Sequence, residues 1–262
     1  MVNRLFDVAC RSERIILFKH LHKGELISHS SKEVDRKSDV LACQLIKSGV
    51  TKRNKVVSLL KDSPIWNIAE NAILKAAGIH VPLPVTTDSE RLKRILMLVL
   101  PTVILIDSDS TAKRVRALLF LTELDGISLV DVRDKAAHTT LIDEDFSELN
   151  HRKVSVETDD TAVILFTSGS TSDPKGVLLS HKNIIIAAEE FGRSDAFNGV
   201  QRSLSVLPMS HSAARKVNYA CQLLGITICY AAPTLSISRN LQLFEAEHLA
   251  VVPFLLQKLQ EE

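Results

Sequence analysis

Residues 163–181 read V-I-L-F-T-S-G-S-T-S-D-P-K-G-V-L-L-S-H. An apolar run rich in β-branched residues ends at a series of small and hydroxylated residues, and a second apolar run begins after Gly176. This pattern predicts a strand, a loop and a second strand. A Ser/Gly/Thr loop alone would also fit a flexible hairpin connection, but the Pro-Lys-Gly that follows it and the apolar strand on each side favour a ligand-binding loop.

The chemistry of this loop is suited to phosphate. Gly169 lets the backbone approach a ligand closely, and Lys175 adds a positive charge. Five hydroxyl groups can donate hydrogen bonds to phosphate oxygens: those of Thr167, Ser168, Ser170, Thr171 and Ser172. Together with Gly176, these residues are predicted to form a cradle for a nucleoside triphosphate. A solvated, purely structural Lys175 remains the alternative for that residue.

Two other phosphate-binding motifs are excluded by spacing. A Walker A loop needs a glycine five residues after Gly169, followed by Lys-Ser or Lys-Thr, but this chain has Pro174 there and Gly176 after the lysine. A dinucleotide-binding fingerprint needs two glycines two positions apart, and none of the nine glycines meets that condition.

The segment T-S-G-S-T-S-D-P-K-G, residues 167–176, resembles the signature phosphate loop of the adenylate-forming superfamily. This superfamily includes acyl-CoA synthetases, luciferases and the adenylation domains of peptide synthetases. Ser172 stands where the family usually has glycine, a change to another small residue. The resemblance implies that the loop holds the β- and γ-phosphates of ATP, that Mg²⁺ bridges them with Ser170 among its ligands, and that Lys175 neutralises charge during catalysis.

Other segments resemble the family in the same order along the chain. Residues 55–60, 63–67, 72–84 and 90–92 resemble the first part of acyl-CoA synthetases. The segment L-P-M-S-H, residues 207–211, looks most like the long-chain fatty acyl-CoA branch, as do Arg215, residues 217–219, Gly225 and residues 252–259. The resemblance places His211, as a catalytic residue, beside the pocket for the substrate carboxylate, although a lone histidine is as often structural. Ala213 and Ala214 depart from the long-chain pattern, which has an aromatic and an acidic residue there, so the substrate assignment stays open.

Composition sets the broad class of the protein. The 262 residues are 45% apolar and 24% charged, enough for a substantial core, and the net charge of +1 gives no electrostatic reason to expect nucleic acid or an anionic membrane as a partner. Four cysteines without a C-x-x-C pair favour reduced thiols in a cytoplasmic protein, and the scattered histidines indicate no metal site. The longest apolar run, 95–106, is too short to span a bilayer, and charged residues interrupt the N-terminus. Peripheral contact with a membrane to collect a lipid remains compatible with these features.

Strands alternating with helices predict an α/β fold with mostly parallel sheets covered by helices. Besides the two strands around the loop, strands are expected at 14–19, 56–60, 81–85, 102–106, 127–130, 203–207, 226–230 and 249–252. Helices are expected at 31–48, 63–78, 111–122, 183–193, 218–224 and 253–262, with one more beginning near Ser89. Residues 133–160 are expected to form a polar surface connection. Trp66, the single tryptophan, is expected to pack in the core.

The predicted function is that of an AMP-forming long-chain fatty acid–CoA ligase, with ATP, a fatty acid, Mg²⁺ and CoA as substrates and cofactors. Residues 1–150 would form the first part of an incomplete N-terminal domain, and 151–262 the part with the phosphate loop and the acyl pocket. Family segments that bind adenine and ribose, and a mobile C-terminal domain, have no counterpart in these residues, so the chain is expected to be truncated. The alternative is a non-catalytic nucleotide-binding or scaffold module. A phosphotransferase would need a catalytic Asp or a second metal site, and no pattern indicates either.

Overall fold

The structure is a computed structural model that describes residues 16–122, 124, 126–133, 142–166, 173–253 and 255–257. The chain divides into two compact units that alternate along the sequence. The first contains Arg36–Lys61 and Ile65–His181, and the second contains, among the described residues, 16–35, 62–64 and 182–257. No helix in the described part of the chain is both long and apolar enough to cross a membrane.

The first unit is built on a six-stranded sheet with the order β6-β5-β3-β4-β7-β8. Its strands are β3 (Lys55–Leu59), β4 (Ile79–Pro82), β5 (Val103–Ile106), β6 (Ser128–Asp131), β7 (Thr161–Phe166) and β8 (Gly176–Ser180). All neighbours pair in parallel except β7 and β8, which form an antiparallel pair. The structure therefore confirms the expected α/β class and both strands that flank the loop.

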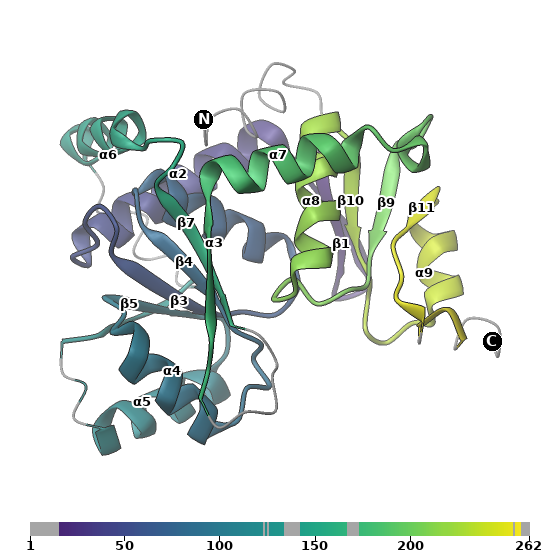
Figure 1. Ribbon diagram of the computed structural model, residues 1–262. Helices are drawn as coiled ribbons and strands as arrows, with labels where there is room; N and C mark the ends of the chain where they lie inside the picture. Colours follow the sequence, from purple (N-terminus) through teal and green to yellow (C-terminus); the bar gives the residue numbers. More distant parts are fainter. Residues whose placement is uncertain are drawn as a thin grey trace. The chain divides into compact units, whose positions relative to one another are not determined.

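Helices α4 (Ser89–Val99) and α5 (Asp109–Thr122) cover one face of this sheet and pack against each other (Figure 1). Their apolar residues repeat at helical spacing, which buries one stripe of each helix. The shared core contains Leu92, Ile95, Leu96 and Val99 of α4, Ala112, Val115 and Leu118 of α5, and Val57, Leu59, Val81, Ile104 and Ile106 of the strands. The first unit also contains α3 (Pro64–Lys75), which starts at its boundary, α6 (Asp143–Ser155) and most of α2 (Ser31–Lys47).

The ends of α4 are fixed in different ways. At its N-terminus the Asp88 side chain accepts a hydrogen bond from the backbone N–H of Arg91 at 2.9 Å. At its C-terminus the cap is Leu100, in the left-handed region with φ of 48°. Glycine is the usual residue at such a cap because any side chain is strained there. Leu100 is nevertheless 62% exposed, so burial of its side chain does not offset this strain.

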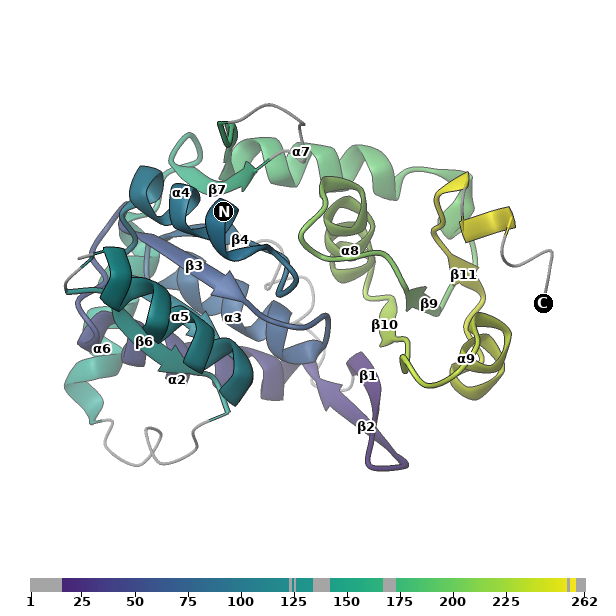
Figure 2. The same cartoon turned by 90° about the horizontal axis from the view of Figure 1, so that it is seen from below.

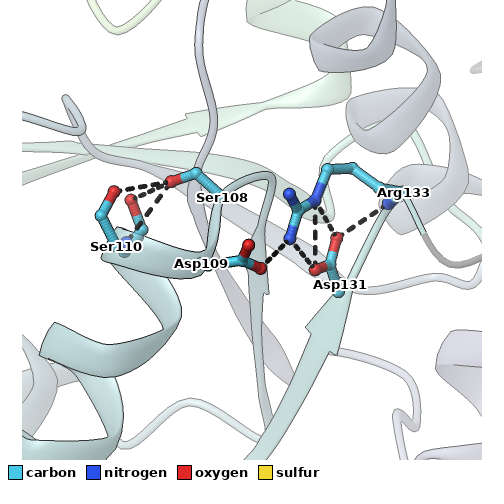
Figure 3. A network of polar contacts seen from close by, with 6 residues as sticks. Ser108, Asp109, Ser110, Asp131 and Arg133 are labelled. Carbon is cyan, nitrogen blue, oxygen red and sulfur yellow. Dashed lines mark hydrogen bonds and ion pairs between the residues drawn. The ribbon is translucent and has the colours of Figure 1, made fainter.

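Polar contacts tie the carboxyl ends of β5 and β6 to the start of α5 (Figure 3). The Arg133 guanidinium contacts both Asp131 and Asp109, each at 2.6 Å. Hydrogen bonding from Arg133 holds the pKa of Asp131 below its usual value. Ser108 precedes the helix, and its hydroxyl accepts from the backbone N–H of Thr111 at 3.3 Å. Arg133 thus forms an ion pair with Asp109 at the carboxyl ends of β5 and β6.

The second unit has a five-stranded sheet with the order β11-β9-β10-β1-β2, in which only β1 and β2 are antiparallel. Its strands are β1 (Ile16–His22), β2 (Glu25–Ser30), β9 (Arg202–Ser205), β10 (Thr227–Tyr230) and β11 (His248–Leu249). Its helices are α7 (His181–Gly192), α8 (Ser212–Leu224) and α9 (Ile237–Phe244), with a short turn of 3-10 helix, η2, at Asp195–Phe197. Helix α9 lies beside β9 and β11, where Phe244 packs on Leu204 and Cys229 (Figures 1 and 2).

Several elements differ from those expected. The expected surface connection at 133–160 contains helix α6. The hydrophobic pattern did not predict this helix, because Leu149 is its one buried residue. Strand β2 and helix α9 were not expected, and α8 begins six residues before the expected start at Asn218. Strand β4 begins at Ile79, two residues before the expected Val81. Most of the remaining boundaries agree within two or three residues, which is the usual uncertainty of helix and strand ends.

Candidate functional site

The two strands that flank the predicted phosphate loop pair in antiparallel and form a hairpin. The pairing of β7 with β8 continues to Phe166↔Gly176, the last position before the loop on each side. The ends of the loop are therefore held opposite each other on the sheet. Residues 167–172, which include the five hydroxyl side chains and Gly169, lie outside the described residues, so their roles as phosphate ligands stay predictions.

Lys175 and Gly176 are the described residues of the predicted nucleotide-binding set. Lys175 is exposed and makes no ion pair with any residue that the structure describes, so its ammonium group is available to an anion. Gly176 has a structural reason to be glycine: a Cβ added there would lie 2.8 Å from Cγ2 of Ile164 and 3.3 Å from the Phe166 ring. Its small size lets these two side chains pack over the hairpin beside the loop.

The opposite end of the hairpin is anchored by charge. The Asp160 carboxylate contacts Lys52 at 3.0 Å and Arg53 at 2.9 Å, and it accepts a hydrogen bond from the backbone N–H of Glu157. These contacts, the Glu157 bond foremost, hold the pKa of Asp160 well below its usual value. The backbone N–H of His181 donates to the Asp160 carbonyl at 3.1 Å, which closes the hairpin. Burial lowers the pKa of His181 to about 4, so this imidazole is neutral at pH 7.

Three buried polar side chains contact one another in the first unit: Ser58 on β3, Glu70 on α3 and His80 on β4, the strand that pairs with β7. Nδ1 of His80 is 3.0 Å from Oε1 of Glu70, and Nε2 of His80 is 2.7 Å from Oγ of Ser58. Although Ser, His and Glu in this order are typical of hydrolase triads, each of these side chains is at most 1% exposed. No substrate reaches a serine so deeply buried, so these three side chains have a structural role. Trp66 is also buried, with its ring centroid 5.3 Å from that of His80, which confirms core packing for the single tryptophan.

In the second unit, His211 stands between β9 and α8. It is the residue before the first turn of α8, and its backbone N–H donates to the Pro208 carbonyl at 3.0 Å. Its side chain is exposed. The position after the carboxyl end of a strand in a parallel sheet is where ligands commonly bind. Lys175 belongs to the first unit and His211 to the second, so the structure describes each within its own unit.

Asp62 fixes the segment that carries His211, a role that sequence reasoning missed. Its Oδ1 accepts a hydrogen bond of 2.9 Å from the backbone N–H of Met209, whose side chain is fully buried. Burial raises the pKa of the Asp62 carboxyl, while the Met209 bond and the charge of His211 oppose that rise. The two partners are separated by 147 residues in the sequence, so no local pattern signals their contact.

A small cavity lies beside α8 in the second unit. This cavity of about 20 Å³ lies among β9, α8 and β10, and its lining includes Ala214, Asn218 and Cys221. This volume accommodates about one water molecule and is far too small for an acyl chain. Of the two alanines that depart from the long-chain pattern, Ala214 is buried at this cavity and Ala213 is exposed. Burial raises the pKa of the Cys221 thiol to about 12, which makes it inert at neutral pH.

Among the described residues, no group of three or more His, Cys, Asp or Glu side chains could hold a metal ion. Magnesium that arrives with a nucleotide needs no such cage, because it keeps several waters and binds mainly through the phosphates and one or two protein oxygens. The exposed Lys175 beside the loop is compatible with an Mg²⁺-ATP complex. Ser170, the predicted protein ligand of the metal, is outside the described residues.

Comparison with known proteins establishes the family. The model of the AMP-binding enzyme family matches residues 7–262, so the chain belongs to this family of ATP-dependent ligases. Equisetin synthetase eqxS of Fusarium heterosporum is 32% identical over 171 residues, 62% of this chain and 4% of that protein. Nonribosomal peptide synthetase GRA1 of Gibberella zeae is 30% identical over 200 residues, 76% of this chain and 2% of that protein. The chain thus spans a small fraction of the length of these relatives.

Solved structures show the same fold. VinN in complex with 3-methylaspartate matches with a TM-score of 0.79 at 16% identity, over 98% of this chain and 67% of that chain. The fatty acyl-adenylate ligase from L. pneumophila, in complex with acyl adenylate and pyrophosphate, matches with a TM-score of 0.78 at 20% identity. That match covers 95% of this chain and 43% of the ligase. These likenesses confirm the fold expected of part of an adenylate-forming enzyme.

Proposed function

We propose that this chain supplies the ATP-gripping part of a ligase that activates a carboxylic acid as its acyl-adenylate. The observation that carries the proposal is the β7–β8 hairpin, which pairs up to Phe166↔Gly176 and so holds both ends of the phosphate loop in a member of the AMP-binding enzyme family. In the reaction, a carboxylate oxygen attacks the α-phosphorus of ATP and pyrophosphate leaves. Because an anion attacks a polyanion, positive charge at the phosphates lowers the barrier.

The proposal assigns a role to each candidate site residue. Lys175, exposed at the end of the loop, would neutralise the β- and γ-phosphates, while hydroxyls and backbone N–H groups of residues 167–172 would hold them. Ser170 would be the protein ligand of an Mg²⁺ ion bound to the phosphates, which would supply further charge neutralisation. His211, on a segment held by Asp62, would orient the acid. We also propose that residues 1–150 form the first part of the domain and that residues 151–262 form the part with the phosphate loop and the acyl pocket.

Two classes of acid are candidates. The L-P-M-S-H segment at 207–211 favours a long-chain fatty acid, with CoA as the thiol that receives the acyl group. An amino acid is favoured because one relative is named a nonribosomal peptide synthetase and the similar structure of VinN is a complex with 3-methylaspartate. In that case the acceptor is the thiol of a carrier protein. Soluble, cytoplasmic operation on small-molecule substrates without nucleic acid fits either candidate.

Exchange of labelled pyrophosphate into ATP, measured with panels of fatty acids and of amino acids, tests the reaction and the substrate class together. Exchange that depends on one panel identifies the class. Absence of exchange with both panels while Mg²⁺-ATP still binds would mean that this chain binds the nucleotide but does not form the adenylate by itself, as either a ligase part that needs further chain or the non-catalytic module would.

Calorimetric titration with Mg²⁺-ATP tests the role of Lys175 separately. Lys175→Ala should weaken binding about tenfold or more, since it removes a charge-assisted contact to phosphate. Lys182→Ala, which removes another exposed lysine just beyond β8, should leave the affinity unchanged. Equal affinity of the Lys175→Ala variant and the unmodified chain would contradict the proposed grip.

A further inference from the structure

An apolar surface on the first unit has no explanation in the fold. Five large side chains at the C-terminal ends of α4 and α5 are strongly exposed: Met97 (54%), Leu98 (63%), Leu100 (62%), Phe120 (87%) and Leu121 (76%). These residues are called the α4–α5 tip below. None of them belongs to the β7–β8 hairpin.

The two halves of the tip lie at the same edge of the sheet. Helix α4 leads into β5 and helix α5 leads into β6, and these two strands pair in parallel from Val103↔Ser128 onward. Since both helices cover one face and contact each other, their C-terminal ends are neighbours. Figure 1 shows α4 and α5 side by side below the strands.

The exposed faces of both helices show the same order of residue types along the helix. Along α4 the outward stripe passes from Glu90 through Arg94 to Leu98, and along α5 it passes from Asp109 through Lys113 and Arg116 to Phe120. Each stripe is therefore acidic first, basic in the middle and apolar at the tip. At 1.5 Å per residue, the last cation of each stripe lies about 6 Å behind the apolar tip.

Charge on these helices is strongly asymmetric. Helices α4 and α5 contain six basic and two acidic residues, a net charge of +4, whereas the whole chain has +1. Of the two acids, Asp109 is paired with Arg133 at 2.6 Å, and Glu90 pairs with Arg94 at 3.4 Å. Lys113 and Arg116 form no ion pair with any described residue, although the charge of Arg116 helps to lower the pKa of Asp131. Glu123 and Asp125, which follow α5, lie outside the described residues. The net charge of the chain thus concealed a local basic face.

Leu100 adds an independent indication. It occupies a left-handed cap with φ of 48°, where glycine would be less strained, and its side chain is exposed. Within the described fold this leucine neither relieves strain nor fills the core. Its presence is accounted for if the side chain is buried against something outside the chain.

We propose that the α4–α5 tip is a membrane-contact surface, which inserts its apolar side chains into an anionic lipid bilayer while Arg94, Lys113 and Arg116 meet the headgroups. Interfacial segments insert about 5–10 Å, which matches the spacing between tip and cations. None of the five tip side chains carries a hydrogen-bond donor or a charge, which suits insertion between acyl chains. The complementary charge of the basic band selects an anionic lipid surface as the occupant rather than a second copy of this basic face.

Vesicle flotation of the 262-residue chain tests the proposal, with phosphatidylcholine alone and with about one third phosphatidylserine, a composition that gives a negative surface potential. The chain should float with the anionic vesicles, and salt should weaken this binding because it screens the cations. Leu98→Ser combined with Phe120→Ser should lower the partition coefficient about tenfold or more, since two large apolar side chains lose burial. Val154→Ser, at another strongly exposed apolar position of the same unit, is the matched control and should bind normally.

Two further variants separate binding from folding. Leu100→Gly relieves the positive φ, so it should melt no lower than the unmodified chain and still bind vesicles less tightly. Lys113→Gln combined with Arg116→Gln should lower binding to anionic vesicles about fivefold for each charge removed. The proposal is overturned if the chain fails to float with anionic vesicles at low salt, or if the Leu98→Ser/Phe120→Ser variant floats as well as the control. Loss of self-association in that variant, measured by sedimentation velocity, without loss of flotation would instead identify a protein interface.

Discussion

The Asp62 carboxylate accepts a hydrogen bond of 2.9 Å from the backbone N–H of Met209, two residues before His211. Asp62 follows β3, whereas Met209 follows β9, so the bond joins two distant parts of the sequence. Met209 is fully buried, and the backbone bond therefore determines how the segment enters α8. The position of His211 depends on a carboxylate that belongs to no recognised motif.

Replacement of Asp62 should affect the His211 segment more than it affects nucleotide binding. Asp62→Ala leaves the Met209 N–H without its acceptor and should cost about 1–3 kcal/mol of unfolding free energy. Asp62→Asn keeps an oxygen that can accept this bond, and it should retain most of the stability. Pyrophosphate exchange that depends on the carboxylic acid substrate should fall in Asp62→Ala and recover in Asp62→Asn. The affinity for Mg²⁺-ATP should be unchanged in both variants. A parallel loss of ATP affinity would show that the effect is not confined to this segment.

The stability of the chain should depend on pH through His181. Its folded pKa, about 4, lies below the ordinary value of 6.5 because the imidazole is buried. The unfolded chain therefore takes up a proton before the folded chain does, and stability falls as pH decreases from about 6.5 to 4, by about 3 kcal/mol in all.

His181→Gln removes this titration. The difference in unfolding free energy between the two proteins, from urea denaturation at several pH values, should be constant above pH 7 and shift in favour of the variant as pH falls. A constant difference down to pH 4 would contradict the assignment of a buried, neutral imidazole.

Gly176 should not tolerate even a methyl group. In Gly176→Ala the new Cβ would meet Cγ2 of Ile164 at 2.8 Å, and overpacking of this kind costs about 1–3 kcal/mol. The strain falls on the last pair of the hairpin, so the affinity for ATP should decrease together with stability. Ile164→Ala removes the obstructing atom, and a double-mutant cycle should therefore show that the two substitutions compensate. Strictly additive losses would place the strain elsewhere.

The buried chain of Ser58, His80 and Glu70 should contribute stability and no nucleophilic reactivity. A fluorophosphonate probe for activated serines should leave Ser58 unlabelled in the folded protein, because the hydroxyl is 1% exposed. Glu70→Ala removes the acceptor of the His80 ring and should cost about 3 kcal/mol or more, as expected when one partner of a buried polar pair is lost. Labelling of Ser58 under native conditions would revive a hydrolase interpretation.

Local sequence predicted the parts of the fold whose signals are local. The β7 and β8 strands, the helix that begins at Ser89 and the burial of Trp66 follow from hydrophobic runs, caps and residue type. Helix α6 was missed because it buries only Leu149, so its outer face reads as a charged surface loop. Strand β2 was missed because its pattern is mostly exposed and it forms only by pairing with β1.

The candidate site also contains features with a local sequence signal and features without one. The phosphate loop is predicted from contiguous residues, and its role stays a prediction; Lys175 is exposed at its end. Asp62 could not be found, because its function depends on a contact across 147 residues. The α4–α5 tip was hidden for a different reason: Leu98 and Phe120 belong to apolar runs, and only the phase of each helix determines which apolar residues face outward.

The pairing of β1 with β10 has a consequence for how the protein is made. Phe18 pairs with Ile228, and the Thr227 hydroxyl donates to the Ile16 carbonyl at 2.7 Å. A ribosome that adds about 5–20 residues per second needs roughly 10–40 seconds to travel from one strand to the other. During that interval β1 has only β2 as a sheet partner, and an isolated two-stranded hairpin is marginal in water. The last strand of the first unit's sheet, β8, ends at Ser180, before β10 is made, so synthesis imposes an order of folding in which the N-terminal strand is the one that waits longest for its partner.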